Sequence, residues 1–121
     1  MENPGAPITP GMSFKLSKEE IIDYQKKSQD GDGEASKKLW LFYEFAVRDR
    51  IKGAEWLEKA AEQGLRDAEY SLAFDLSRQG SPRYDLEKAK YWATKAADRG
   101  EKLARGLLQE IKEIEERGDS K

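Results

Sequence analysis

From Ser17 onward the apolar residues of the chain recur every three or four positions, which is the spacing of one face of an α-helix. Ser17 and Glu20 form a capping-box pattern at the start of the first such run, and Gly31 and Gly33 follow its end. The pattern predicts an all-α chain with helices near residues 17–30, 34–48, 51–63, 66–79, 84–99 and 102–117.

The two ends of the chain lack this periodicity. Three of the four prolines lie in the first eleven residues together with Gly5 and Gly11. Such a composition favours a flexible segment. We expect a flexible N-terminal tail over 1–13, one helical domain over 14–118 and a short C-terminal tail over 119–121.

The helical part repeats itself. The segments "GDGEASKKL" at 31–39, "GLRDAEYSL" at 64–72 and "GEKLARGLL" at 100–108 each place Ala four residues after Gly and Leu four residues after Ala. "WLEKAAEQG" at 56–64 likewise aligns with "WATKAADRG" at 92–100. The glycines are 33 and then 36 residues apart, and a fixed period of this length is typical of a helical solenoid.

Each element of the repeat has a mechanical reason. Gly64 and Gly100 can adopt the left-handed conformation that ends a helix. Trp56 and Trp92 each precede a pair of alanines by one turn, so that a large side chain lies beside small ones that let a partner helix approach. The repeat therefore predicts interlocking helix pairs.

The pattern resembles the Sel1-like repeat, an α/α relative of the tetratricopeptide repeat, over about residues 31–108. The residues that carry it are Ala68, Leu72, Asp85, Lys88-Ala89, Trp92, Lys95-Ala96-Ala97 and Gly100. The resemblance implies a right-handed superhelix of antiparallel helix pairs, about two repeats with flanking helices. It also implies a protein-binding surface rather than an enzyme.

Two connectors depart from the family pattern. One unit has "RQGSPRYD" where the family has a glycine-rich connector. The other has the shorter "VRDRIKG", with Gly53 where the family prefers Ala. The connector geometry is therefore not given by the resemblance.

The stretch "LWLFYEFAV" at 39–47 has eight apolar residues and one charge, Glu44. A central helix of a solenoid is covered on several sides, so we expect this stretch to be helical and part of the core. Because aromatic residues favour strands, a strand is the alternative. The last predicted helix has a single apolar stripe and is expected to cap the stack, its stripe being Ala104, Leu107, Leu108, Ile111 and Ile114.

The resemblance implies that the first helix of each pair lines the concave surface. Tyr70 and Phe74 lie one turn apart, opposite the face that bears Leu72, and packing against the adjacent unit is the alternative for them. Aromatic anchors with a charged rim suit a protein interface. The predicted partner-binding residues are Lys37, Leu41, Glu44, Tyr70, Phe74, Ser77, Arg78, Glu110 and Glu113.

Composition removes several classes of function. The chain has no Cys and no His, which excludes Ser/His and Cys/His nucleophiles and nearly all zinc, copper and haem sites. The 22 basic and 24 acidic residues nearly cancel, and no basic run exceeds two residues, so nucleic acid is not an expected partner. "DGDGE" at 30–34 lacks the remaining ligands of a calcium loop, and a helix-ending turn is expected there. We expect no cofactor and no metal.

No apolar run approaches a membrane span and no signal peptide is evident, which predicts a cytoplasmic protein, or a periplasmic or secreted one if a signal peptide has been removed. The acidic residues show no spacing that pairs two carboxylates for catalysis. We therefore expect a non-enzymatic module that binds another protein.

Short chains that resemble this family include bacterial immunity proteins, so neutralisation of a cognate toxin is the more specific expectation. Glu44, Glu110 and Glu113 on the expected inner wall predict a partner with a basic or mixed surface. The alternatives are a general adaptor or scaffold in a signalling or envelope complex and, less favoured, a carboxylate-based enzyme.

Overall fold

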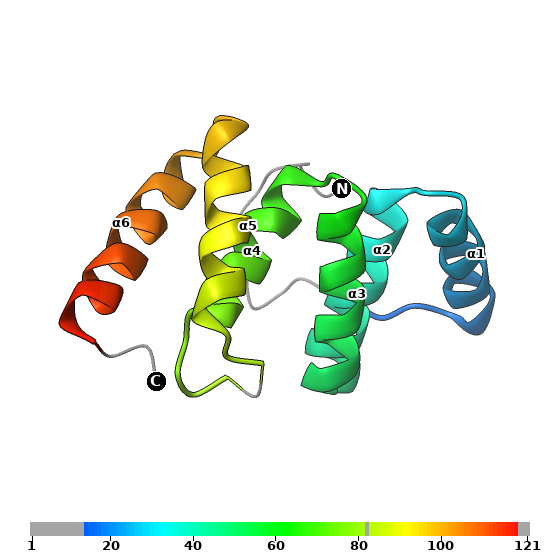
Figure 1. The fold of residues 1–121 in the computed structure, drawn as a ribbon. Helices are drawn as coiled ribbons and strands as arrows, with labels where there is room; N and C mark the ends of the chain where they lie inside the picture. Colours follow the sequence, from blue (N-terminus) through cyan, green and yellow to red (C-terminus); the bar gives the residue numbers. More distant parts are fainter. Residues whose placement is uncertain (1–13, 82, 119–121) are drawn as a thin grey trace.

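The computed structural model describes residues 14–81 and 83–118 of the chain. Each helix packs on the next in chain order, and α4 also contacts α6, so the helices form one continuous stack (Figure 1). The elements are α1 (Lys18–Gln29), α2 (Gly33–Leu41), the π-helix η1 (Phe42–Val47), α3 (Arg50–Glu62), α4 (Arg66–Leu76), α5 (Leu86–Asp98) and α6 (Lys102–Arg117). The prediction of an all-α solenoid is confirmed. The tails predicted over 1–13 and 119–121 lie outside the described residues.

The core is built from leucines and closely packed alanines. Leu57, Leu72, Leu76 and Ile111 are at most 4 % exposed. The alanines between them let neighbouring helices approach, as the repeat predicts: Ala60, Ala61, Ala68, Ala73, Ala89 and Ala93 are all completely buried. The predicted apolar stripe of α6 faces this core; its role as a capping helix stays a prediction.

The turns follow the predicted glycine positions. Gly64 and Gly100 have φ values of 91° and 90°, in the left-handed region that a residue with a Cβ seldom adopts. In the turn 30–34, Asp32 is the N-cap of α2 and accepts hydrogen bonds from the backbone N–H groups of Glu34 and Ala35. The Asp32 carboxylate thus caps the start of α2. This agrees with the expectation that residues 30–34 form the turn that ends the preceding helix.

Two polar clamps tie the end of each helix pair to the preceding pair. In the first, Gln63 Nε2 donates to the Ser28 carbonyl (2.7 Å) and Gln63 Oε1 accepts from the Ser36 hydroxyl (2.5 Å). We call this set the Gln63 clamp. Gln63 stands directly before the turn glycine of its unit, so the residue in the same place one repeat later is Arg99.

The second clamp uses charged groups and an equivalent side-chain partner, but its carbonyl partner lies three residues later in the repeat than Ser28 does in the first. Arg99 Nη2 donates to the Gly64 carbonyl (2.8 Å), and Arg99 Nη1 donates to Glu69 Oε2 (3.2 Å). Glu69 and Ser36 each lie five residues after the glycine that opens their unit. Glu69 is fully buried, whereas the Arg99 side chain is 45 % exposed. This Arg99 clamp joins α4 and α5 to the end of α3.

The stretch 39–47 is helical throughout, so the strand alternative is wrong. The expectation of a core segment holds only for its beginning. Leu39 is completely buried, but Phe45 and Val47 are 44 % and 50 % exposed. The predicted helix 34–48 is also not uniform, because α2 gives way to η1, which ends at Arg48 in the left-handed region (φ 65°).

The π-helix accounts for Gly53. A π-helix has a wider turn than an α-helix, and η1 brings Glu44 directly against α3. A Cβ on Gly53 would lie 3.1 Å from both the Cβ and the backbone nitrogen of Glu44. The absence of a side chain at residue 53 therefore allows η1 and α3 to touch.

Replacing Arg99 by Ala should destabilise the protein strongly. The substitution leaves the Glu69 carboxylate buried without its cation, which costs about 3 kcal/mol of unfolding free energy. Equilibrium urea denaturation measures the loss. The double variant Glu69→Ser with Arg99→Gln installs the neutral pair of the Gln63 clamp and should recover more than half of it. Equal instability of the single and double variants would show that the two clamps are not equivalent.

Two helical glycines should respond oppositely to Ala. Gly53→Ala forces Glu44 and η1 away from α3 and should cost about 1–2 kcal/mol. A Cβ on Gly106 in α6 would have no neighbouring atom within 4 Å, so Gly106→Ala should gain about 0.5–1 kcal/mol. Thermal and urea unfolding compare the two variants. A stabilising Gly53→Ala would mean that the contact between η1 and α3 adjusts freely.

Candidate functional site

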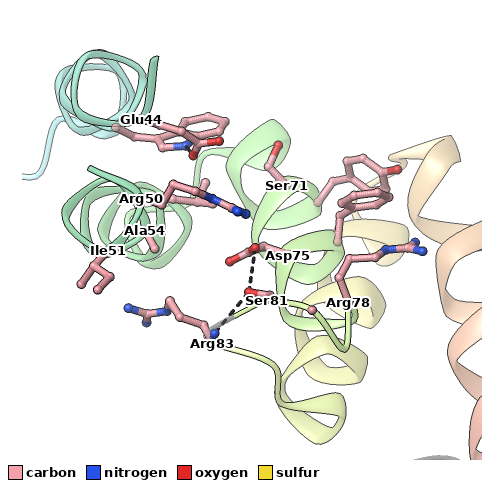
Figure 2. Close-up of a pocket in the computed structure, with 14 residues that line it drawn as sticks. Glu44, Arg50, Ile51, Ala54, Ser71, Asp75, Arg78, Ser81 and Arg83 are labelled. Atoms are coloured by element: carbon pink, nitrogen blue, oxygen red, sulfur yellow. Dashed lines mark hydrogen bonds between the residues drawn. The ribbon is translucent and has the colours of Figure 1, made fainter. Parts of the chain in front are cut away.

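A groove with a volume of about 530 Å³ lies between two helix pairs. Figure 2 shows residues from η1 and α3 along one side and residues from α4 and the following loop along the other. Because α3 and α4 are antiparallel neighbours, the start of α3 meets the end of α4 here, at the opposite end from the turn at Gly64. The groove therefore lies at the end of the joint, the contact between the two helix pairs, where no turn connects α3 to α4.

Aromatic and aliphatic side chains form its apolar part. Tyr70 packs against the core, whereas Phe74 is 43 % and Ile51 is 63 % exposed. The rings of Tyr70 and Phe74 have centroids 6.3 Å apart, and the Arg78 guanidinium lies 4.1 Å from the Phe74 centroid. A cation over an aromatic face is attracted by the ring, which holds Arg78 along the groove wall.

Two carboxylates line the groove, and the only hydrogen bonds they accept within the described part of the chain come from neutral groups. Glu44 Oε1 accepts from Trp40 Nε1 (2.8 Å), and Asp75 Oδ1 accepts from the Ser81 hydroxyl (3.0 Å). These bonds fix the carboxylates but leave their charge uncompensated by a direct ion pair.

Three arginines line the same groove, and they differ in whether a carboxylate is paired with them. Arg78 pairs with Glu110 on α6 (3.3 Å), and Arg83 pairs with Glu58. Among residues 14–81 and 83–118, the Arg50 side chain forms neither a hydrogen bond nor an ion pair. Figure 2 shows its side chain reaching from α3 toward Asp75. The groove thus combines exposed apolar surface with charges of both signs.

The structure brings four of the nine predicted partner-binding residues into the groove: Glu44, Tyr70, Phe74 and Arg78. The others lie outside it in different settings. Leu41 is half-buried, and Ser77 is 6 % exposed with its hydroxyl donating to the Phe74 carbonyl. The charged ones are on the surface, with these contacts: Lys37 to Asp67 (2.7 Å), Glu110 to Arg78 (3.3 Å) and Glu113 to Gln109 (3.4 Å).

Sequence reasoning missed further groove residues. Trp40 lines the groove where Leu41 was expected, and Arg50 and Arg83 come from the two connectors that depart from the repeat pattern. Counting along the first helices alone does not include connector residues. The signal available was the concentration of arginines in "VRDRIKG" and "RQGSPRYD".

Within the described ranges, no group of three or more His, Cys, Asp or Glu side chains is arranged to hold a metal ion. No helix in the same ranges has both the length and the apolar character needed to cross a membrane.

Comparison with known families identifies the repeat. The family model described as the Sel1 repeat matches residues 41–65 and 66–101, which include every groove-lining residue except Trp40. The chain belongs to the Sel1 repeat family. Sel1 repeats act as protein-binding or scaffold modules and are typically not enzymes.

Several proteins resemble this Sel1 repeat chain. The uncharacterized protein YibG of Escherichia coli (strain K12) is 35 % identical over 106 residues, which are 85 % of this chain and 69 % of YibG. The Sel1-repeat-containing protein YjcO of the same strain is 45 % identical over 74 residues, 61 % of this chain but 30 % of YjcO. A crystal structure of a Sel1 repeat protein from Oxalobacter formigenes superposes with a TM-score of 0.62 at 25 % identity, covering 73 % of this chain and 68 % of that one.

Stability should separate the two rings of the groove. Tyr70→Ala removes a ring packed against the core and should cost about 2 kcal/mol, whereas Phe74→Ala removes a largely exposed ring and should cost less than about 1 kcal/mol. Urea unfolding of both variants measures the difference. Equal costs would assign Phe74 to the core and remove it as a free contact surface.

Proposed function

We propose that this Sel1 repeat protein is a non-enzymatic binding module that holds a segment of another protein in the groove between its two helix pairs. The exposed ring of Phe74 in the groove, beside Tyr70, is the observation that carries the proposal. Large rings bury much area at a low cost in side-chain entropy and are common anchors of protein interfaces.

Charged residues around the rings support the same proposal. Arg78 is held against Phe74, and Glu110 extends the charged rim onto α6. Rim charges steer association and set the register of a partner rather than supplying most of the affinity. Since the groove presents both signs, a partner with a mixed surface fits it, in line with the expectation from the sequence.

The more specific form of the proposal is that the partner is a toxin and the chain is its immunity protein. Neutralisation requires only a compact surface that covers the toxin, and a groove of this kind meets that requirement. A general adaptor in a signalling or envelope complex is the alternative form, in which binding leaves the activity of the partner intact. The cytoplasmic location and the absence of a nucleic-acid partner stay predictions from the sequence.

A matched pair of aromatic variants tests the proposal. Phe74→Asp places a charge on the apolar part of the groove, whereas Tyr91→Asp changes a similarly exposed ring on α5, which does not line the groove (exposed fractions 43 % and 58 %). Tagged variants are used to capture proteins from the native host, which are quantified by mass spectrometry. We expect one protein captured by the wild type and Tyr91→Asp but reduced at least tenfold with Phe74→Asp.

The identity of that protein decides between the two forms. A toxin whose activity is suppressed by the wild type but not by Phe74→Asp supports the immunity role. A bound protein whose activity is unchanged supports the adaptor. Capture that is equal for all three proteins, or no specific capture, would contradict binding in the groove.

A further inference from the structure

We propose that the partner segment held in the groove carries a carboxylate that binds Arg50 and, next to it, a large apolar side chain that packs on Phe74. This inference rests on the proposed function and names the chemistry of the segment. Its starting point is the one groove-lining arginine that has no partner among the described residues.

The three groove arginines differ in what holds them. Arg78 and Arg83 are each neutralised by a glutamate, so their charge already serves the fold. Arg50 is exposed, and its guanidinium lies within the groove (Figure 2). A guanidinium offers a planar set of N–H donors that fits a carboxylate with two parallel hydrogen bonds. The Arg50 guanidinium can thus donate hydrogen bonds to the carboxylate of an acidic side chain or of a C-terminus.

The position of Arg50 on the helix strengthens its attraction for an anion. Arg50 is the first residue of α3, after the N-cap Asp49, where the helix dipole is positive. Residues 48–52 contain three cations, Arg48, Arg50 and Lys52, and one carboxylate, Asp49. Asp49 is engaged by the backbone N–H of Lys52, so its charge is partly used by the helix terminus. The segment at this lip of the groove therefore carries a net positive charge, and Arg50 is the cation of the segment that lines the groove.

Apolar surface lies next to this positive lip. Ile51 follows Arg50 in the chain and is 63 % exposed, and Phe74 on α4 is 43 % exposed. Both line the groove with Arg50. A ligand that paired only with the Arg50 charge would leave this apolar surface exposed to water. An acidic residue beside a leucine, isoleucine or phenylalanine would bury the apolar surface as well and gain the corresponding free energy.

The two groove carboxylates select against other ligands. A nucleic-acid strand brings a phosphate every few ångströms, and these would approach Glu44 and Asp75 as well as Arg50. A basic segment would meet Arg50 on its way to either carboxylate, and both carboxylates already accept hydrogen bonds from Trp40 and Ser81. A segment with a single carboxylate and an apolar neighbour brings one negative charge to Arg50 instead of a series of them, and brings no cation against Arg50.

A random dodecamer library displayed on phage tests the inference on the full chain. We expect selected peptides to contain Asp or Glu beside Leu, Ile or Phe. A synthetic copy of the best peptide should lose affinity about tenfold when its acid is replaced by the corresponding amide, as expected for one charge-assisted contact. Fluorescence anisotropy at two salt concentrations measures both peptides, and binding of the acidic peptide should weaken with salt.

Two arginine variants locate the contact. Arg50→Gln should bind the acidic and amide peptides equally, whereas Arg105→Gln, which alters an exposed arginine on α6 away from the groove lining, should keep the tenfold preference. Selection of basic or uncharged peptides, an unchanged preference in Arg50→Gln, or displacement of the peptide by a single-stranded oligonucleotide would overturn the inference.

The two proposals can fail separately. A host protein whose capture depends on Phe74 but not on Arg50 would leave the proposed function standing and refute the acidic contact. Acidic peptides that bind through Arg50, without any host protein that depends on Phe74, would support the contact chemistry and refute the proposed function.

Discussion

Stacking of each helix pair on the one before it depends on a polar side chain that crosses the joint between them. Alanine-rich helix faces pack closely but carry little shape that fixes how far one pair is rotated against the next. Gln63 and Arg99 contribute to that restriction, since each binds a backbone carbonyl that precedes its own helix pair (Ser28 or Gly64) and a side chain within that pair. A buried polar group favours arrangements that keep its hydrogen bonds, so the bond from Arg99 to the buried Glu69 Oε2 favours the observed packing, although Glu69 Oε1 has no hydrogen-bond partner among the described residues.

The groove follows from that geometry together with the π-helix. The Arg99 clamp closes the joint between α3 and α4 at the Gly64 end. At the other end η1 leans on α3 through the contact between Glu44 and Gly53, and its Phe45 and Val47 remain exposed instead of filling the core. A regular α-helix over the same residues would present different side chains to α3. The wider turn of η1 thus helps to leave the joint open where the aromatic and arginine side chains gather.

Much of this architecture could be predicted from the sequence because it depends on local rules. Glycine at 64 and 100 specifies left-handed turns, and the single apolar stripe of α6 identifies the face that this helix buries, whatever the remaining contacts are. The π-helix could not be predicted, since the apolar residues around Glu44 satisfy an α-helical period equally well. Trp40, Arg50 and Arg83 were missed for a related reason: their place in the groove depends on where second helices and connectors lie, and counting along first helices does not contain that information.

The open end of the joint is also where a ligand gains most from the fold. A segment that touches Arg50 on α3 and Phe74 on α4 contacts both helix pairs at once, so its binding free energy adds to the stability of their packing. The Arg99 clamp at the far end limits how much the two pairs must reorganise, which lowers the entropy lost on binding. Arg78 and Arg83 are already fixed by glutamates and shape the walls, while Arg50 has no ion pair with any residue that the structure describes. The end of the joint at Gly64 is therefore held by the Arg99 clamp, and the opposite end holds the proposed binding groove.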